Sequence, residues 1–148
     1  MGMLGNLEIT GGNKGNYAMI TKTTNSTMIS GNSMAGICDG ISAITPVSTG
    51  VLLITLSFTQ DSFTGGTALY RLRYGTGTGP AATALDTGTQ IGIDFTIDKD
   101  TVERPVALTG ILTGLTLGTA YWIDLSGTPS TGSIIGDDFT LTIIEYVG

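Results

Sequence analysis

The sequence predicts an all-β fold: one domain, built as an antiparallel Greek-key or jelly-roll sandwich. Glycine occurs 23 times and threonine is spread along the chain, while runs of Ala, Glu, Lys and Gln are missing. Glycine costs about 1 kcal/mol in a helix interior and threonine is β-branched, so this composition disfavours helices. Apolar and polar residues alternate in many short stretches separated by turn signals, which indicates roughly six or more strands.

The stretch VLLITLSFTQ (51–60) alternates most strictly, with apolar residues at 52, 54, 56 and 58. Alternation of this kind places one face on a core. TALYRLRY (67–74), QIGIDFTID (90–98) and TAYWIDL (119–125) follow the same pattern, and VALTGILT (106–113) and FTLTIIEYV (139–147) are further strand candidates. In 90–98 the pattern places Ile93 on the apolar side. In 119–125 it places Trp122 and Asp124 opposite the apolar side.

The first fifty residues are less regular. NYAMITKTT (16–24) has a strand pattern, and residues 33–50 fit a buried strand followed by a loop. The extreme N-terminus is rich in Gly and Asn, so we expect residues 1–16 to be a flexible arm that becomes ordered on a neighbour. Residues 17–148 are then the β-sandwich domain.

Charge is sparse, at 12% of residues, and the net charge is −6. An acidic surface repels phosphate, so neither nucleic acid nor a membrane surface is an expected partner. Cys38 is the single cysteine, which excludes an intrachain disulfide. The N-terminus has no signal-peptide pattern, and no apolar run approaches the roughly 20 residues of a membrane helix.

The sequence contains no histidine, which removes the Ser-His-Asp and Cys-His pairs and most transition-metal sites. We therefore expect no enzyme, no catalytic residues and no cofactor. Carboxylates remain as an open question for calcium, because several oxygens have to converge on that ion. The candidates are Asp94, Asp98 and Asp100 on one strand side and the Asp137-Asp138 pair. Asp98-Lys99-Asp100 also fits a plain charged turn, and Asp137-Asp138 also fits the start of a strand after Gly136.

The run GTGTGP (75–80) resembles a phosphate-binding loop at first sight. Its spacing is GxGxG rather than GxGxxG, no Gly-Lys-Ser/Thr follows it, and a strand pattern resumes soon afterwards. We interpret it as a connection between two strands.

Arg71 and Arg73 share one side of the strand at 67–74, opposite Tyr70 and Tyr74. They fit an exposed basic pair above core tyrosines. They also fit a subunit interface, where they would pair with acids such as Asp94 or Glu103.

Residues 115–121 resemble the corner written Leu-x-Pro-Gly-Thr-x-Tyr in fibronectin type III domains. Leu115, Gly118, Thr119 and Tyr121 match, and Leu117 replaces the proline. The resemblance implies that the tyrosine hydroxyl bonds to the backbone across a Greek-key connection.

A longer resemblance covers residues 51–148, whose order of motifs looks like small jelly-roll modules of phage virions, related in shape to TNF/C1q-like trimers. It implies a homotrimer with the closing strand LTIIEYV near its axis, which makes Ile143, Ile144 and Tyr146 interface candidates. It implies a protein that is assembled in the host cytoplasm and decorates or cements a phage capsid by binding a shell protein and itself. The alternative is a fibre or tail tip that recognises a host surface saccharide through loops.

Overall fold

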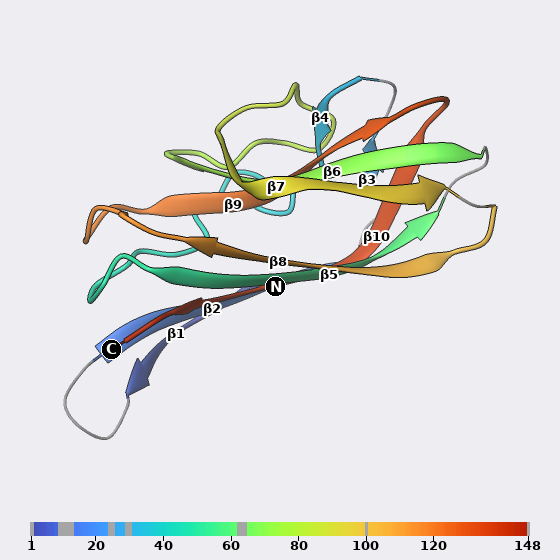
Figure 1. The fold of residues 1–148 in the computed structure, drawn as a ribbon. Coiled ribbons are helices and arrows are strands. Elements are labelled where there is room, and N and C mark those ends of the chain that lie inside the picture. The colour runs from blue at the N-terminus through green and yellow to red at the C-terminus, as the bar shows by residue number, and fades with distance from the viewer. Residues whose placement is uncertain are drawn as a thin grey trace.

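The computed structural model describes residues 2–8, 14–23, 26–28, 31–61, 65–99 and 101–147, and the side chains of all these except 2–8, 14 and 26–28. All regular elements in these ranges are strands, in two antiparallel sheets that face each other as a sandwich (Figure 1). The predicted all-β sandwich is confirmed. No helix in these ranges is long and apolar enough to cross a membrane.

The larger sheet, sheet A, has the order β1-β2-β10-β5-β8, with β3 pairing β10 beside this path. Its strands are β1 (Gly2–Glu8), β2 (Lys14–Lys22), β3 (Ser26–Met28), β5 (Leu52–Asp61), β8 (Arg104–Leu112) and β10 (Ile134–Glu145). The smaller sheet, sheet B, has the order β4-β9-β6-β7. Its strands are β4 (Ser33–Met34), β6 (Gly66–Thr76), β7 (Thr89–Lys99) and β9 (Tyr121–Pro129).

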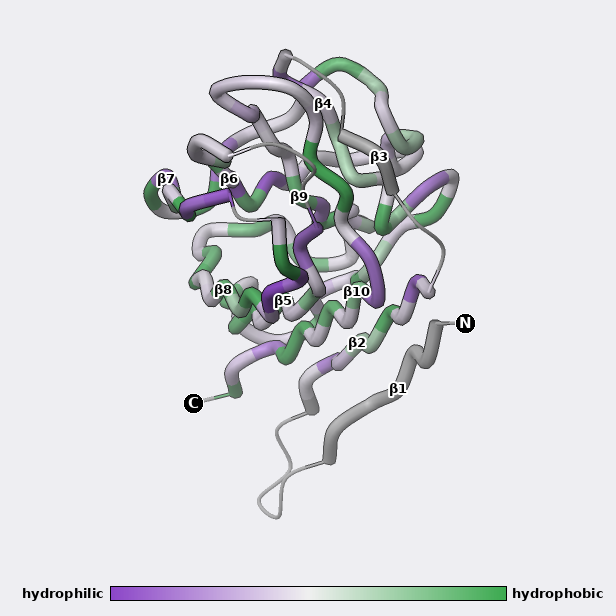
Figure 2. The backbone as a smooth tube through the Cα atoms, turned by 90° about the vertical axis from the view of Figure 1, so that its right-hand side faces the viewer, coloured by the Kyte–Doolittle hydropathy of each residue, from purple (hydrophilic) through white to green (hydrophobic). Residues whose placement is uncertain are grey.

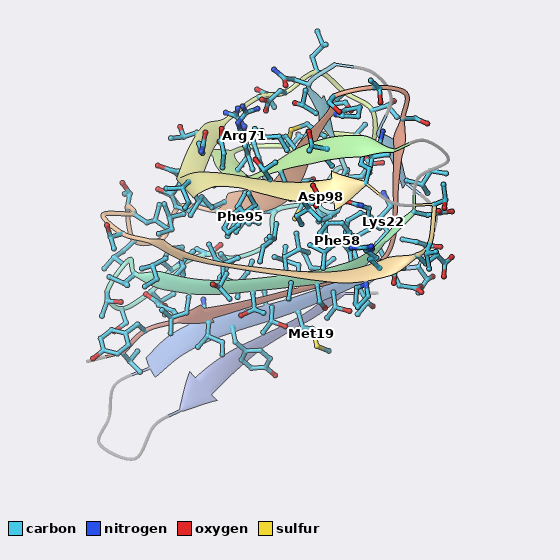
Figure 3. The ribbon with its side chains drawn as sticks, turned by 45° about the vertical axis from the view of Figure 1, so that its right-hand side comes forward. Met19, Lys22, Phe58, Arg71, Phe95 and Asp98 are labelled. Carbon is cyan, nitrogen blue, oxygen red and sulfur yellow. The ribbon has the colours of Figure 1, made fainter. Side chains whose placement is uncertain are left out.

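The core lies between the two sheets, where the alternating apolar residues of the strands meet. Phe58 of β5 stacks on Phe139 of β10 and meets Tyr70 of β6 edge-on, each with ring centroids 5.2 Å apart. Phe58 and Phe95 lie between the sheets in Figure 3, whereas Met19 points away from the core below β2. The inner positions of β5 and β6 are those that the alternation predicts.

One prediction about strand sides is wrong. Residues 92–94 of β7 form a bulge, because Leu72 pairs with Ile91 and Tyr70 with Phe95, so Ile93 is pushed out and is 74% exposed. Trp122 and Asp124 do point away from the core, as predicted, but not toward solvent. Residues 33–45 and 79–88 lie over β9 and bury both side chains.

Residues 2–8 and 14–16, part of the predicted arm, lie in β1 and β2. β1 pairs along its whole length with β2 and occupies the edge of sheet A. In Figure 1, β1 lies on the outer side of β2, away from the other strands of sheet A. The flexibility of the segment 1–16, and its ordering on a neighbour, stay predictions.

Candidate functional site: the uncharged face

The outer side of sheet A carries three cross-strand rows of uncharged residues, because the register of β8, β5, β10 and β2 aligns them. The rows are Ile111-Leu53-Ile144-Tyr17, Thr109-Thr55-Thr142-Met19 and Ala107-Ser57-Thr140-Thr21. We call these residues the uncharged face. Green hydrophobic and pale residues alternate along β8 and β10 in Figure 2.

The first row is the most apolar part of the uncharged face. Ile111 is 64% exposed, Leu53 41% and Ile144 38%, and Met19 in the next row is 36% exposed. Single exposed apolar residues are common, but a contiguous apolar row on a flat sheet indicates a surface that contacts another molecule.

The apolar row continues around the edge of the sandwich into a groove of about 710 Å³ between β8 and β7. Ile93, pushed outward by the β7 bulge, lines the groove together with Phe95, Leu53 and Ile111. The lining residues carry no charge. The uncharged face and this groove therefore form one continuous surface.

The outer side of sheet B differs, because charged side chains occupy its open part. Arg71 Nε lies 2.9 Å from Asp94 Oδ1, and the Arg71 hydrogen bond holds the pKa of that carboxyl below its usual value. Arg73 pairs with Asp86 and donates from Nη1 to the Gly88 carbonyl at 3.1 Å. Both arginines thus have acidic partners within their own chain. The pairing with Asp94 or Glu103 across a subunit interface stays a prediction.

The interface candidates on the closing strand differ in their location. Ile144 belongs to the uncharged face, and Tyr146, 54% exposed, lies just beyond it. Ile143 is fully buried in the core, because neighbouring residues of a strand point to opposite sides. Its side chain does not reach the surface, so Ile143 is no longer an interface candidate.

Beside Tyr146, the carboxylate of Glu145 orders the loop 47–50. It accepts hydrogen bonds from the backbone N–H groups of Asn16, Val47, Ser48, Thr49 and Gly50, at 2.7–3.3 Å. Burial opposes ionisation of this fully buried side chain, but the N–H groups outweigh it and lower the pKa of Glu145. The loop at this end of sheet A is therefore held by one charged group.

The corner residues lie where the tyrosine-corner motif would put them. Tyr121 Oη accepts a hydrogen bond from the backbone N–H of Thr116 at 3.1 Å. Gly118 has φ +77°, a conformation that L side chains rarely adopt, and its N–H donates to the Pro46 carbonyl at 2.8 Å. Leu115 is buried beside them. These contacts shape the connection between β8 and β9 and leave the uncharged face untouched.

The glycine-rich run after β6 is a connection, and its glycine at 79 serves close packing. A Cβ at Gly79 would lie 1.8 Å from the Cys38 carbonyl oxygen, so only glycine fits against the loop that covers β9. Cys38 itself is fully buried.

The carboxylates weighed for calcium do not gather in the described part of the chain. Asp94 pairs with Arg71, Asp98 is exposed on β7, and Asp137-Asp138 lie at a bulge of β10. No group of three or more His, Cys, Asp or Glu able to hold a metal occurs among the described residues. Asp100 lies outside them.

Most of the uncharged face could not be predicted from the sequence. Of its residues, only Ile144 is among the predicted interface candidates. Alternation gave the outward side of each strand, for example Leu53, Thr55 and Ser57 on β5. Alternation does not show that β2, β10, β5 and β8 are neighbours, because these strands are far apart in the sequence.

Comparisons with known proteins give no family. No family model matches the chain, and no curated protein matches it. Among solved structures, the CBM22-1 xylan-binding domain from Paenibacillus barcinonensis Xyn10C is similar over 99% of this chain and 83% of its own, with 10% identity and a TM-score of 0.39. The CBM22-1-GH10 modules of Clostridium thermocellum endo-1,4-beta-D-xylanase 10B, complexed with xylohexaose, match over 95% of this chain and 24% of theirs, with 18% identity and a TM-score of 0.38. Similarity at this level carries no argument about the function of the chain.

Proposed function

We propose that the protein is a non-catalytic structural module that assembles with further copies of itself through the uncharged face. The observation that carries the proposal is the absence of charge from all three cross-strand rows in a chain of net charge −6. Two acidic molecules repel each other wherever their charges meet, so a face without charge is where copies approach at the lowest electrostatic cost.

The size of the uncharged face is consistent with a weak individual contact. Four strands about 4.8 Å apart and three rows about 6.8 Å apart cover about 400 Å². Stable protein interfaces bury about 800 Å² on each partner. Contacts of this size become durable when many copies act together, as they do on a repeated lattice.

The finer proposal follows the sequence resemblance: a homotrimer in a phage virion, assembled in the host cytoplasm, where it decorates or cements the capsid. A shell protein is then the second partner of the module. The uncharged face supports assembly as such, and the resemblance motivates the virion.

A second candidate function is binding of a neutral saccharide at the same face. Tyr17 pairs with Ile144, and the exposed Tyr146 follows two residues later, so two tyrosines flank one end of the threonine-rich rows. Aromatic rings with an apolar body and a polar tip suit a neutral sugar.

The test adds one positive charge to the centre of the uncharged face. We expect light scattering of the wild type to give a mass that rises with concentration above 15.2 kDa, and Thr55→Lys to lower that mass. Thr78→Lys, in the exposed loop after β6, is the matched control and should behave as the wild type. Equal masses for Thr55→Lys and wild type would contradict assembly through this face. Retardation of the wild type in xylan-containing gels, abolished in Tyr146→Ala, would favour the saccharide candidate instead.

A further inference from the structure

Strand β8 ends sheet A as an edge without the usual protection. Its residues 104–112 pair with β5 on one side, and within the described part of the chain no strand pairs with the other side. Edge strands normally carry charges, proline or bulges that prevent further pairing. Pro105 and Arg104 lie at the very start of β8, and residues 106–112, VALTGIL, contain none of these features.

The edge of sheet B on the same side of the sandwich shows the contrast. β7 bulges at residues 92–94, where Gly92 has φ +69°, and it carries Asp94 and Asp98. A bulge and two carboxylates make β7 a poor template for another strand. The two edges lie side by side in Figure 1, so only β8 offers a regular ladder there.

Apolar side chains accompany the open edge of β8. Ile111 on β8 and Ile93 on the neighbouring β7 are 64% and 74% exposed, and both line the uncharged groove between the two strands. A strand added to β8 would lie against this groove and remove apolar surface from water, which favours the pairing.

We propose that β8 pairs antiparallel with β8 of a second copy across a two-fold axis at Thr109. This register pairs the seven residues 106–112 with one another and leaves none of them over. It places Ile111 opposite Ala107 of the second copy, Leu112 opposite Val106 and Leu108 opposite Gly110, so larger residues meet smaller ones. The occupant is a copy of this chain, because an uncharged edge lets two molecules of net charge −6 approach.

The pairing has a consequence for the uncharged face, and this step rests on the proposed function. A two-fold axis perpendicular to the sheet keeps both outer sides on the same side of the dimer. The rows of the two copies then join into a surface eight strands wide, of about 800 Å², which reaches the area of a standard interface.

A cysteine at the two-fold axis tests the register directly. Antiparallel pairs have Cα atoms about 4.5–5.5 Å apart, which is within the range of a disulfide. We expect Thr109→Cys to form a covalent dimer under mild oxidation, seen on a non-reducing gel. The wild type should stay monomeric on the gel because Cys38 is buried, and Thr78→Cys because its cysteine lies outside the paired strand β8. A Thr109→Cys protein that remains monomeric on the gel, at a concentration at which light scattering shows assembly, would overturn the pairing.

A combined variant separates the edge from the face, because Ile111 belongs to both. Ile111→Lys should lower the mass in light scattering, and Leu85→Lys, at a site 84% exposed on the loop over sheet B, should not. Thr109→Cys should still cross-link when combined with Thr55→Lys, because the edge does not need the face. Cross-linking that persists while Thr55→Lys has no effect on mass would leave the edge pairing intact and refute the proposed face. If Thr109→Cys does not cross-link while Thr55→Lys lowers the mass, the edge pairing is refuted and the proposed face is not.

Discussion

Glu145 holds the loop 47–50 with a single buried carboxylate. Five backbone N–H groups point at its two oxygens, and the side chain is fully buried. Hydrogen bonds to a charged group are stronger than those between neutral groups, and a buried donor left without a partner costs about 1–3 kcal/mol.

We expect Glu145→Gln to lower the free energy of unfolding at neutral pH by about 1–3 kcal/mol, because an amide nitrogen would face donors. The lowered pKa of Glu145 gives the sign of the pH effect: its stabilising contribution is present above the usual pKa of 4.5 and is lost as the pH falls through the lower folded value. Urea unfolding at neutral pH and below pH 4.5 measures both. The exposed Glu103→Gln is the control, and an equal loss in both variants would contradict the role of Glu145.

Asp124 shows the opposite behaviour under the loop that covers β9. Burial raises the pKa of Asp124 to about 7, although the N–H groups of Ile37, Leu125 and Cys38 and the charge of Lys22 act against it. A folded pKa above the ordinary 3.8 means that the protonated form favours folding.

The contribution of Asp124 to stability is therefore greatest below about pH 3.8 and declines as the pH rises to about 7. We expect Asp124→Asn to remove this decline, so that its free energy of unfolding is flatter than that of the wild type between these values. Chemical unfolding across this pH range measures the slope, with the exposed Asp39→Asn as control. A wild-type slope that survives in Asp124→Asn would exclude this carboxyl as its source.

At the scale of elements, β1 is an edge strand held by one neighbour. It pairs with β2 alone at the edge of sheet A, whereas β2 is held on its other side by β10. Asn16, which donates to Glu145, lies in β2 and remains when β1 is removed.

We expect deletion of residues 1–13 to leave a folded domain that unfolds in one cooperative transition, because β2 keeps its pairing with β10 when β1 is removed. Circular dichroism with heating tests this, with the full chain as reference. A truncated chain without a cooperative transition would show that β1 is essential to the domain.

The elements also show how far the sequence leads. Alternation predicted β5 and β6 with their inner sides, because both strands are regular and lie over a single core. It failed for Ile93, since the bulge places three residues, 92–94, opposite Arg71 and turns Ile93 outward, and one glycine in a strand does not show where a bulge lies. It does not show that loops cover Trp122 and Asp124, because the covering loops come from distant segments of the sequence.

For the whole molecule, the fold class could be predicted and the candidate site could not. Composition and alternation are local properties, so they indicate an all-β sandwich. The uncharged face exists only because Ile111, Leu53, Ile144 and Tyr17 meet across four strands. The order of the strands in the sheet brings these residues together, and local sequence patterns do not show that order.

The lone cysteine has a consequence for where the molecule can work. Cys38 donates from Sγ to the Ile123 carbonyl at 2.8 Å, and burial raises its pKa to about 12, so at neutral pH the thiol is protonated and shielded. Oxidants act on exposed thiolates. The buried thiol therefore forms no disulfide cross-links between copies of the folded chain, whether the surroundings are reducing or oxidising.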